Sequence, residues 1–144
     1  MHDQLIYALG TATRLACTTF EQPDHLALQA NLDLACAVPA RSGWECKAAA
    51  HAGFFTALAD ASKDACAAPV LRNGAELAYL LMLGAGRVAD NMVINSRQRM
   101  LASLRCRNVE DAALEMERHL RILSFMGRVW QPRLLGKATG MTAF

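Results

Sequence analysis

The chain has 144 residues, the size of one ordinary domain, which is enough to bury a single hydrophobic core. Hydrophobic residues make up 53% of it while Pro and Gly number only 4 and 9, a balance that favours helices over a sandwich of short strands. The net charge of +2 comes from scattered Lys and Arg residues without a basic stripe. This composition excludes nucleic-acid binding as the expected role of the chain on its own.

The cysteines indicate neither a disulfide framework nor a zinc site. They are odd in number, lie far apart and include no Cys-x-x-Cys pair: Cys17, Cys36, Cys46, Cys66 and Cys106. We expect them to be packing residues in a reducing cytoplasm. The N-terminal residues lack a secretory signal and no apolar run is long enough to span a bilayer, so we expect a soluble cytoplasmic protein without a membrane partner.

Apolar residues recur at three- and four-residue steps and predict six helices in chain order, over residues 4–19, 24–38, 42–62, 69–84, 88–105 and 108–130. The links between them are short, which is typical of antiparallel neighbours. The predicted fold is therefore an all-α antiparallel bundle of six or seven helices. Residues 1–130 form one effector-binding and dimerisation domain, and residues 131–144, which contain Pro132, form a loose C-terminal tail.

Three predicted helix ends have local signals. Ser42 is expected to cap the third helix, with Glu45 as its capping-box partner. Gly84 and Gly86 are expected to end or bend the fourth helix. Asn108 is expected to cap the sixth.

The stretch from Gly84 to Ala89 matches the dinucleotide fingerprint G-x-G-x-x-A, which predicts a nucleotide-binding enzyme as an alternative function. That fingerprint needs a strand before it and an acidic residue after a second strand. Residues 75–83 continue a helical pattern, and residues 104–107 end another. We therefore expect a turn between two helices at this point, no catalytic residues and no enzyme.

Three polar side chains fall on apolar helix faces. His51 follows Ala48 and precedes Leu58 on one face, and His119 lies among the apolar residues of the last helix. Arg97 shares a face with Val93 and two further apolar residues. Each histidine is either a hydrogen-bonded core residue or part of a ligand site. Arg97 either reaches solvent, pairs with a carboxylate, or is neutralised by a ligand.

The segments 51–62 and 97–120 resemble the FCD domain, the helical C-terminal effector domain of FadR-type regulators in the GntR family. The resemblance extends from about residue 6 to residue 123, and its most specific part is 100–120. It implies a ligand-sensing and dimerisation domain of a transcriptional regulator. Its partners are a second copy of the chain and a small-molecule effector that is a carboxylate or acyl compound. A ligand-free helical dimerisation module is a further alternative.

Members of that family carry an N-terminal winged helix-turn-helix, which is not visible in these residues. The resemblance therefore implies DNA binding only through such a domain in a longer parent protein. Many FCD domains also hold a metal. His51, Phe55 and Arg97 occupy three of the four ligand positions, whereas the fourth is retained as His119. The resemblance thus implies a degenerate metal site and no cofactor.

The same positions imply an effector pocket. Arg97 is expected to contact an anion, and His119 and His51 are expected to supply hydrogen bonds. Phe55 and Met100 are expected to form its apolar wall.

Overall fold

The computed structural model describes the backbone of residues 2–142 and the side chains of residues 2–128. Within that part it contains helices and no strand. The α-helices are α1 (Asp3–Thr18), α2 (Gln22–Ala37), α3 (Trp44–Ala61), α4 (Ala67–Ala85), α5 (Asp90–Arg105) and α6 (Val109–Thr142). Two one-turn 3-10 helices, η1 (Ala40–Ser42) and η2 (Arg87–Ala89), precede α3 and α5. The predicted all-α bundle is confirmed.

The last helix extends past its expected end at residue 130. The loose tail predicted for residues 131–144 falls where the structure describes no side chains, and it stays a prediction.

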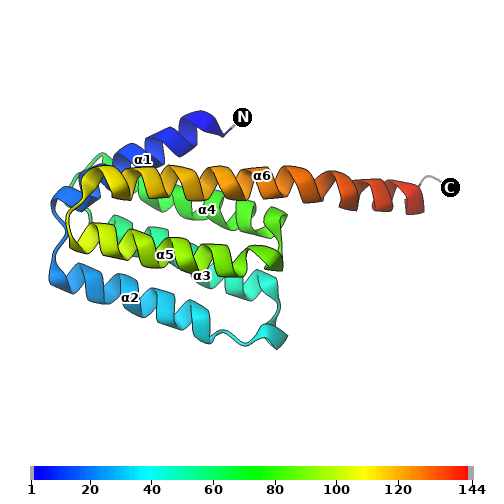
Figure 1. Ribbon diagram of the computed structural model, residues 1–144, viewed down its shortest axis with the longest axis horizontal. Helices are drawn as coiled ribbons and strands as arrows, with labels where there is room; N and C mark the ends of the chain where they lie inside the picture. Colours follow the sequence, from blue (N-terminus) through cyan, green and yellow to red (C-terminus); the bar gives the residue numbers. More distant parts are fainter. Residues whose placement is uncertain (1, 143–144) are drawn as a thin grey trace.

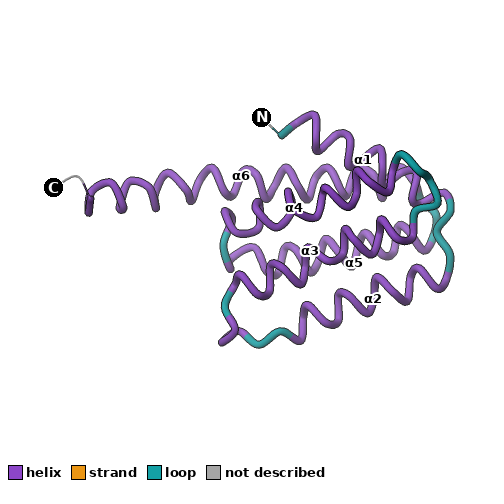
Figure 2. The backbone as a smooth tube through the Cα atoms, turned by 180° about the vertical axis from the view of Figure 1, so that it is seen from behind, coloured by secondary structure: helices purple, strands orange, loops and turns teal. Residues whose placement is uncertain are grey.

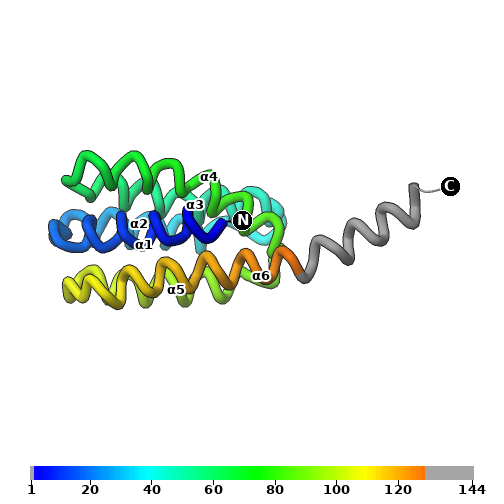
Figure 3. Tube along the Cα trace, turned by 90° about the horizontal axis from the view of Figure 1, so that it is seen from above, coloured from blue at the N-terminus to red at the C-terminus, as the bar shows by residue number. Residues whose placement is uncertain are grey.

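The chain turns back at each link between helices (Figures 1 and 2). Helix α2 lies at one edge and packs on α3 and α5, whereas α1, α4 and α6 pack on one another at the opposite side. Viewed from above, α1 runs between α4 and α6 and contacts both (Figure 3). Helix α3 lies between α2 and α4 and also contacts α1.

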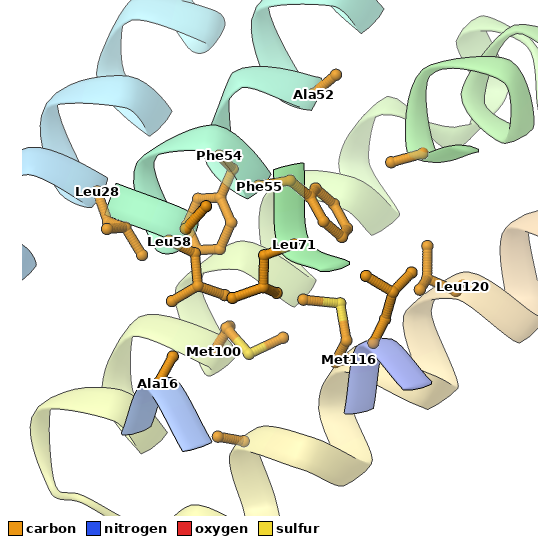
Figure 4. Close-up of a cluster of buried hydrophobic side chains, with 14 of the residues drawn as sticks. Ala16, Leu28, Ala52, Phe54, Phe55, Leu58, Leu71, Met100, Met116 and Leu120 are labelled. Carbon is orange, nitrogen blue, oxygen red and sulfur yellow. The ribbon is translucent and has the colours of Figure 1, made fainter. Parts of the chain in front are cut away.

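One continuous core fills the space between the helices. Figure 4 shows its centre, where two aromatic rings of α3 meet aliphatic and thioether side chains of the other helices. These fully buried residues include Phe54, Phe55 and Leu58 of α3, Leu71 of α4, Met100 of α5, and Met116 and Leu120 of α6.

The helix ends follow local chemistry. Asn108 caps α6 as predicted, since its Oδ1 accepts a hydrogen bond from the backbone N–H of Asp111 at 3.2 Å. Gly86 ends α4 with a φ of +82°, a conformation that favours glycine. The predicted Ser42 cap is wrong. Ser42 lies in η1, and α3 begins after Gly43, whose φ of +90° turns the chain without any side-chain cap.

Only Cys17 is buried, whereas Cys36, Cys46, Cys66 and Cys106 are exposed. The expectation that the thiols serve as packing residues is therefore wrong for four of the five. These four residues lie on the solvent side of their helices or in links, where neighbouring helices do not cover them.

Helices α1 and α4 approach closely at Gly74. A Cβ atom added there would lie 2.4 Å from Cδ2 of Leu9 and 3.2 Å from Cδ2 of Phe55. Because the helix contains a glycine at this point, α4 can pack against both α1 and the central helix α3.

Among the described residues, no single helix is both long and apolar enough to cross a membrane. The pair Ala67–Ala85 and Arg87–Arg105 reaches the required length and hydropathy together, but it is bent by 112° at its junction.

Candidate functional site

The three polar residues predicted on apolar faces meet inside the bundle. Arg97 of α5, His119 of α6 and His51 of α3 are 0%, 1% and 1% exposed. The Nη1 atom of Arg97 lies 3.0 Å from Nε2 of His119, and its Nη2 donates to the backbone carbonyl of His51 at 3.4 Å. Residues of three helices therefore meet at one buried polar group, in which Arg97 contacts the His119 side chain and the His51 backbone carbonyl. We call it the Arg97 cluster (Arg97, His119 and His51).

Arg97 has no carboxylate partner among the described residues, and it does not reach solvent. Its guanidinium lies over the rings of Phe54 and Phe55, with the carbon atom Cζ 4.7 Å and 5.1 Å from the ring centroids. Its Nε is buried and has no hydrogen-bond partner. Burial lowers the pKa of Arg97 to about 9, so the side chain stays positively charged at neutral pH. Of the three alternatives for this residue, solvent contact and carboxylate pairing are both wrong.

The acid that acts electrostatically on Arg97 is Glu115, but its oxygens are already bound elsewhere. Ser96 Oγ donates to Glu115 Oε2 at 2.7 Å, and Arg99 Nε donates to Oε1 at 2.9 Å. Glu115 is thus neutralised by Arg99. The buried positive charge of Arg97 is left without a counter-ion of its own.

The hydrogen-bond partners assign the tautomers of both histidines. A guanidinium only donates, so Nε2 of His119 accepts from Arg97 and the ring proton is on Nδ1. The carboxylate of Asp90 only accepts, so the ring Nε2 of His51, at 3.1 Å, carries the proton and Nδ1 is bare. Both Nδ1 atoms are buried without a partner. The cluster therefore has two unsatisfied donors, on Arg97 and His119, and one unsatisfied acceptor, on His51.

Both histidines are held in the neutral form. Burial lowers the pKa of His119 well below its usual value, and the positive charge of Arg97 lowers it further. Burial also lowers the pKa of His51, although its hydrogen bond to Asp90 acts in the opposite direction. The guanidinium is thus the charged group of the cluster at neutral pH.

Sequence reasoning missed Asp90 and Lys47, which continue the cluster to the surface. The second oxygen of Asp90 lies 3.1 Å from Nζ of Lys47, and the two side chains are 22% and 18% exposed. Asp90 precedes Arg97 by seven residues on α5, and Lys47 precedes His51 by four on α3. These spacings place each pair on one helix face, and that signal was present in the sequence.

Phe55 and Met100, which the sequence predicted as apolar wall residues, are both buried on helices that contribute to the cluster. Phe55 has its ring against the guanidinium of Arg97, whereas Met100 follows Arg97 by three residues and lies in the core near Leu71 (Figure 4).

The Arg97 cluster is closed. The surface hollow between α4 and α6, of about 370 Å³, is lined by Leu77, Leu80 and Leu81, among others, and does not include the cluster. A second hollow of about 270 Å³ lies between α1 and α4. A ligand could reach Arg97 only if side chains around the cluster moved.

The residues of the cluster do not fit the metal site that the FCD resemblance suggests. The Nε2 atoms of His51 and His119 are occupied by Asp90 and Arg97, and a guanidinium repels a cation. Among the described residues, no three His, Cys, Asp or Glu side chains are grouped so that they could hold a metal ion.

The fingerprint from Gly84 to Ala89 joins two helices. Helix α4 precedes it where a dinucleotide site needs a strand, and η2 follows Gly86. This segment thus lacks the strand that precedes the glycine turn of a pyrophosphate site.

Comparisons of the chain with family models, with curated proteins and with solved structures found no match.

Proposed function

We propose that this chain is a ligand-sensing helical domain in which the Arg97 cluster binds a small anion, with a carboxylate as the preferred class. The observation that supports it is the buried guanidinium of Arg97, which is fully enclosed, positively charged and without a carboxylate partner. An unpaired buried charge costs several kcal/mol, which is comparable to the free energy of unfolding of a whole domain. A bound anion offsets that cost.

The unsatisfied hydrogen-bonding groups support the same ligand class. An anion only accepts hydrogen bonds, and the cluster has two buried donors without partners, on Arg97 Nε and on His119 Nδ1. The rings of Phe54 and Phe55 beside the guanidinium favour an anion with an apolar part, such as a short acyl chain.

The cluster joins α3, α5 and α6, so a ligand there contacts three helices at once. Binding changes the preferred arrangement of a protein by its differential affinity for the alternatives. By resemblance to FCD domains, we propose that the output is the geometry of a homodimer in a GntR-type transcriptional regulator, with DNA bound by a winged helix of the parent protein.

The test is thermal unfolding in sodium acetate, butyrate and succinate, with ionic strength held constant and acetamide as the uncharged control. A ligand of the native state stabilises it by mass action, so each tenfold rise in concentration above Kd adds about 1.4 kcal/mol. Arg97→Met keeps most of the side-chain volume and should abolish the anion response. Because it removes an unpaired buried charge, the variant should fold and unfold at no lower temperature than the wild type.

Arg72→Met is the matched control. Arg72 pairs with Asp60 at 3.0 Å in an exposed ion pair, so the substitution changes the net charge equally but lies outside the cluster. It should leave the anion response unchanged. A response that survives Arg97→Met refutes the proposed site, and stabilisation by none of the three anions favours the ligand-free dimerisation module.

A further inference from the structure

A chain of polar groups connects the buried Arg97 with the surface. It runs from Lys47 Nζ to Asp90 at 3.1 Å, from Asp90 to His51 Nε2 at 3.1 Å, and from the His51 carbonyl to Arg97 at 3.4 Å. Exposure falls along it from about a fifth for Lys47 and Asp90 to 1% for His51 and 0% for Arg97. An anion that follows this chain meets polar partners throughout, which lowers the cost of removing it from water.

Asp90 lies in this chain of polar groups between Lys47 and His51. It is itself a carboxylate, the ligand class of the proposed function, and it already binds two positively charged or hydrogen-donating groups, Lys47 and His51. A second anion beside His51 would meet a like charge from Asp90, which disfavours the simultaneous presence of both. The Asp90 carboxylate and the carboxylate of a ligand therefore compete with each other.

Asp90 is also the first residue of α5, directly after η2 and the Gly86 turn that ends α4. Its movement would act on the junction of these two helices. Trp44 lies between this junction and the cluster. Its indole Nε1 donates to the Met82 carbonyl near the end of α4 at 2.8 Å, and its ring centroid is 6.5 Å from that of His51. The indole thus touches both the cluster and the junction.

We propose that the Asp90 carboxylate is an internal competitor of the anion: it repels an anion that approaches Arg97 along this chain of polar groups, and it moves away from His51 when the anion binds, which shifts the α4–α5 junction. This inference rests on the proposed function. Asp90 thereby sets the concentration at which the sensor responds.

The experiment measures acetate binding through Trp44 fluorescence in a Trp130→Phe background, which leaves one tryptophan. Asp90→Asn removes the negative charge but keeps an acceptor for His51 Nε2–H. We expect the acetate concentration at half-saturation to fall by about tenfold, as the loss of one nearby like charge predicts. The free Asp90→Asn protein should already show part of the fluorescence change that acetate causes in the wild type.

Glu110→Gln is the matched control, since it makes the same charge change in an exposed pair with Arg14 at 2.9 Å. It should leave the half-saturation point unchanged. Circular dichroism checks that Asp90→Asn is folded, and Asp90→Ser, which also suits the start of a helix, replaces it if it is not.

The outcomes separate this inference from the proposed function. Tighter binding by Asp90→Asn, or binding by that variant alone, supports the internal competitor. A second outcome is that Arg97→Met abolishes acetate binding, whereas Asp90→Asn binds acetate as well as the wild type or more weakly. It overturns the internal competitor and retains the proposed function. The absence of any acetate response in both wild type and Asp90→Asn overturns both.

Discussion

A single guanidinium determines the electrostatics of the buried polar group. Arg97 carries a charge that no neighbouring carboxylate balances, and the rings of Phe54 and Phe55 on one side cannot replace a counter-ion. Its charge also keeps His119 neutral, because a second positive charge at 3.0 Å in a buried setting is disfavoured. The result is a buried group in which the histidine takes up a proton poorly and the guanidinium lacks a counter-ion, the feature on which the proposed anion site rests.

This arrangement predicts a dependence of stability on pH. The pKa of His119 is lowered in the folded protein, whereas in the unfolded chain it has the ordinary value of about 6.5, so the unfolded state takes up the proton first. The stability due to neutral His119 is fully present above pH of about 6.5. It falls below that pH, by about 1.4 kcal/mol per pH unit, until the pH reaches the lowered pKa of the folded state.

Urea unfolding at a series of pH values measures the slope of the free energy of unfolding against pH. His119→Gln should reduce this slope by about 1.4 kcal/mol per pH unit, the value for one proton. His2→Gln, at the start of the chain, is the matched control for the loss of a histidine and should keep the wild-type slope. An unchanged slope in His119→Gln contradicts the neutral, buried state of His119.

The sequence placed His51, Arg97 and His119 on apolar helix faces, because apolar residues three and four positions away fix which face of a helix points inward. It left open whether Arg97 reaches solvent. It could not predict that Arg97 lacks a carboxylate. That fact depends on which helices are neighbours and on Glu115 being held by Arg99 and Ser96. The seven-residue spacing places Asp90 on the same helix face as Arg97, but its hydrogen bond to His51, 39 residues away, could not be predicted for the same reason.

At the scale of helices, apolar periodicity located the first five to within a few residues and the start of the sixth, whose C-terminal end lies twelve residues beyond the expected residue 130. The ends of the helices depended on single side chains. Asn108 was recognised because its cap partner is three residues away. Ser42 was misassigned because the same signal can close a 3-10 turn, and Gly43 then redirects the chain. The pattern also contained no information on how closely two helices pass.

The crossing of α1 and α4 gives a prediction for Gly74. Gly74→Ala adds a Cβ 2.4 Å from Cδ2 of Leu9 and 3.2 Å from Cδ2 of Phe55, so two buried side chains must shift to make room for it. We expect a loss of about 1–3 kcal/mol despite the better helix propensity of alanine, which alone is worth about 1 kcal/mol. Urea unfolding measures the difference.

Gly127→Ala is the matched control in α6. The nearest atom to its added Cβ is 3.7 Å away, an ordinary contact with Gly84. This variant should therefore be as stable as the wild type or slightly more stable, since only the propensity changes. Equal effects of the two substitutions would show that the α1–α4 crossing is loose.

At the scale of the whole molecule, one side of the bundle remains apolar at its surface. Leu5 and Leu80 are 55% and 56% exposed, and each lines one of the two hollows along α1, α4 and α6. The sequence predicted the bundle but not this side, since an amphipathic pattern shows that a residue is apolar and not whether another helix covers it. Exposed apolar patches of this kind are typical of protein interfaces.

The last prediction concerns self-association, which the FCD resemblance implies. We expect a homodimer at micromolar concentration that uses this apolar side, because burying an exposed leucine contributes roughly 1.5–3 kcal/mol. Leu80→Glu places a charge there and should raise the dimer dissociation constant by about tenfold or more, since each factor of ten is about 1.4 kcal/mol. Leu34→Glu is the matched control, because Leu34 is 65% exposed on α2, at the opposite edge. Sedimentation velocity over a range of concentrations measures both constants. A monomer at every concentration contradicts the dimer, and equal weakening by the two substitutions contradicts the choice of this side.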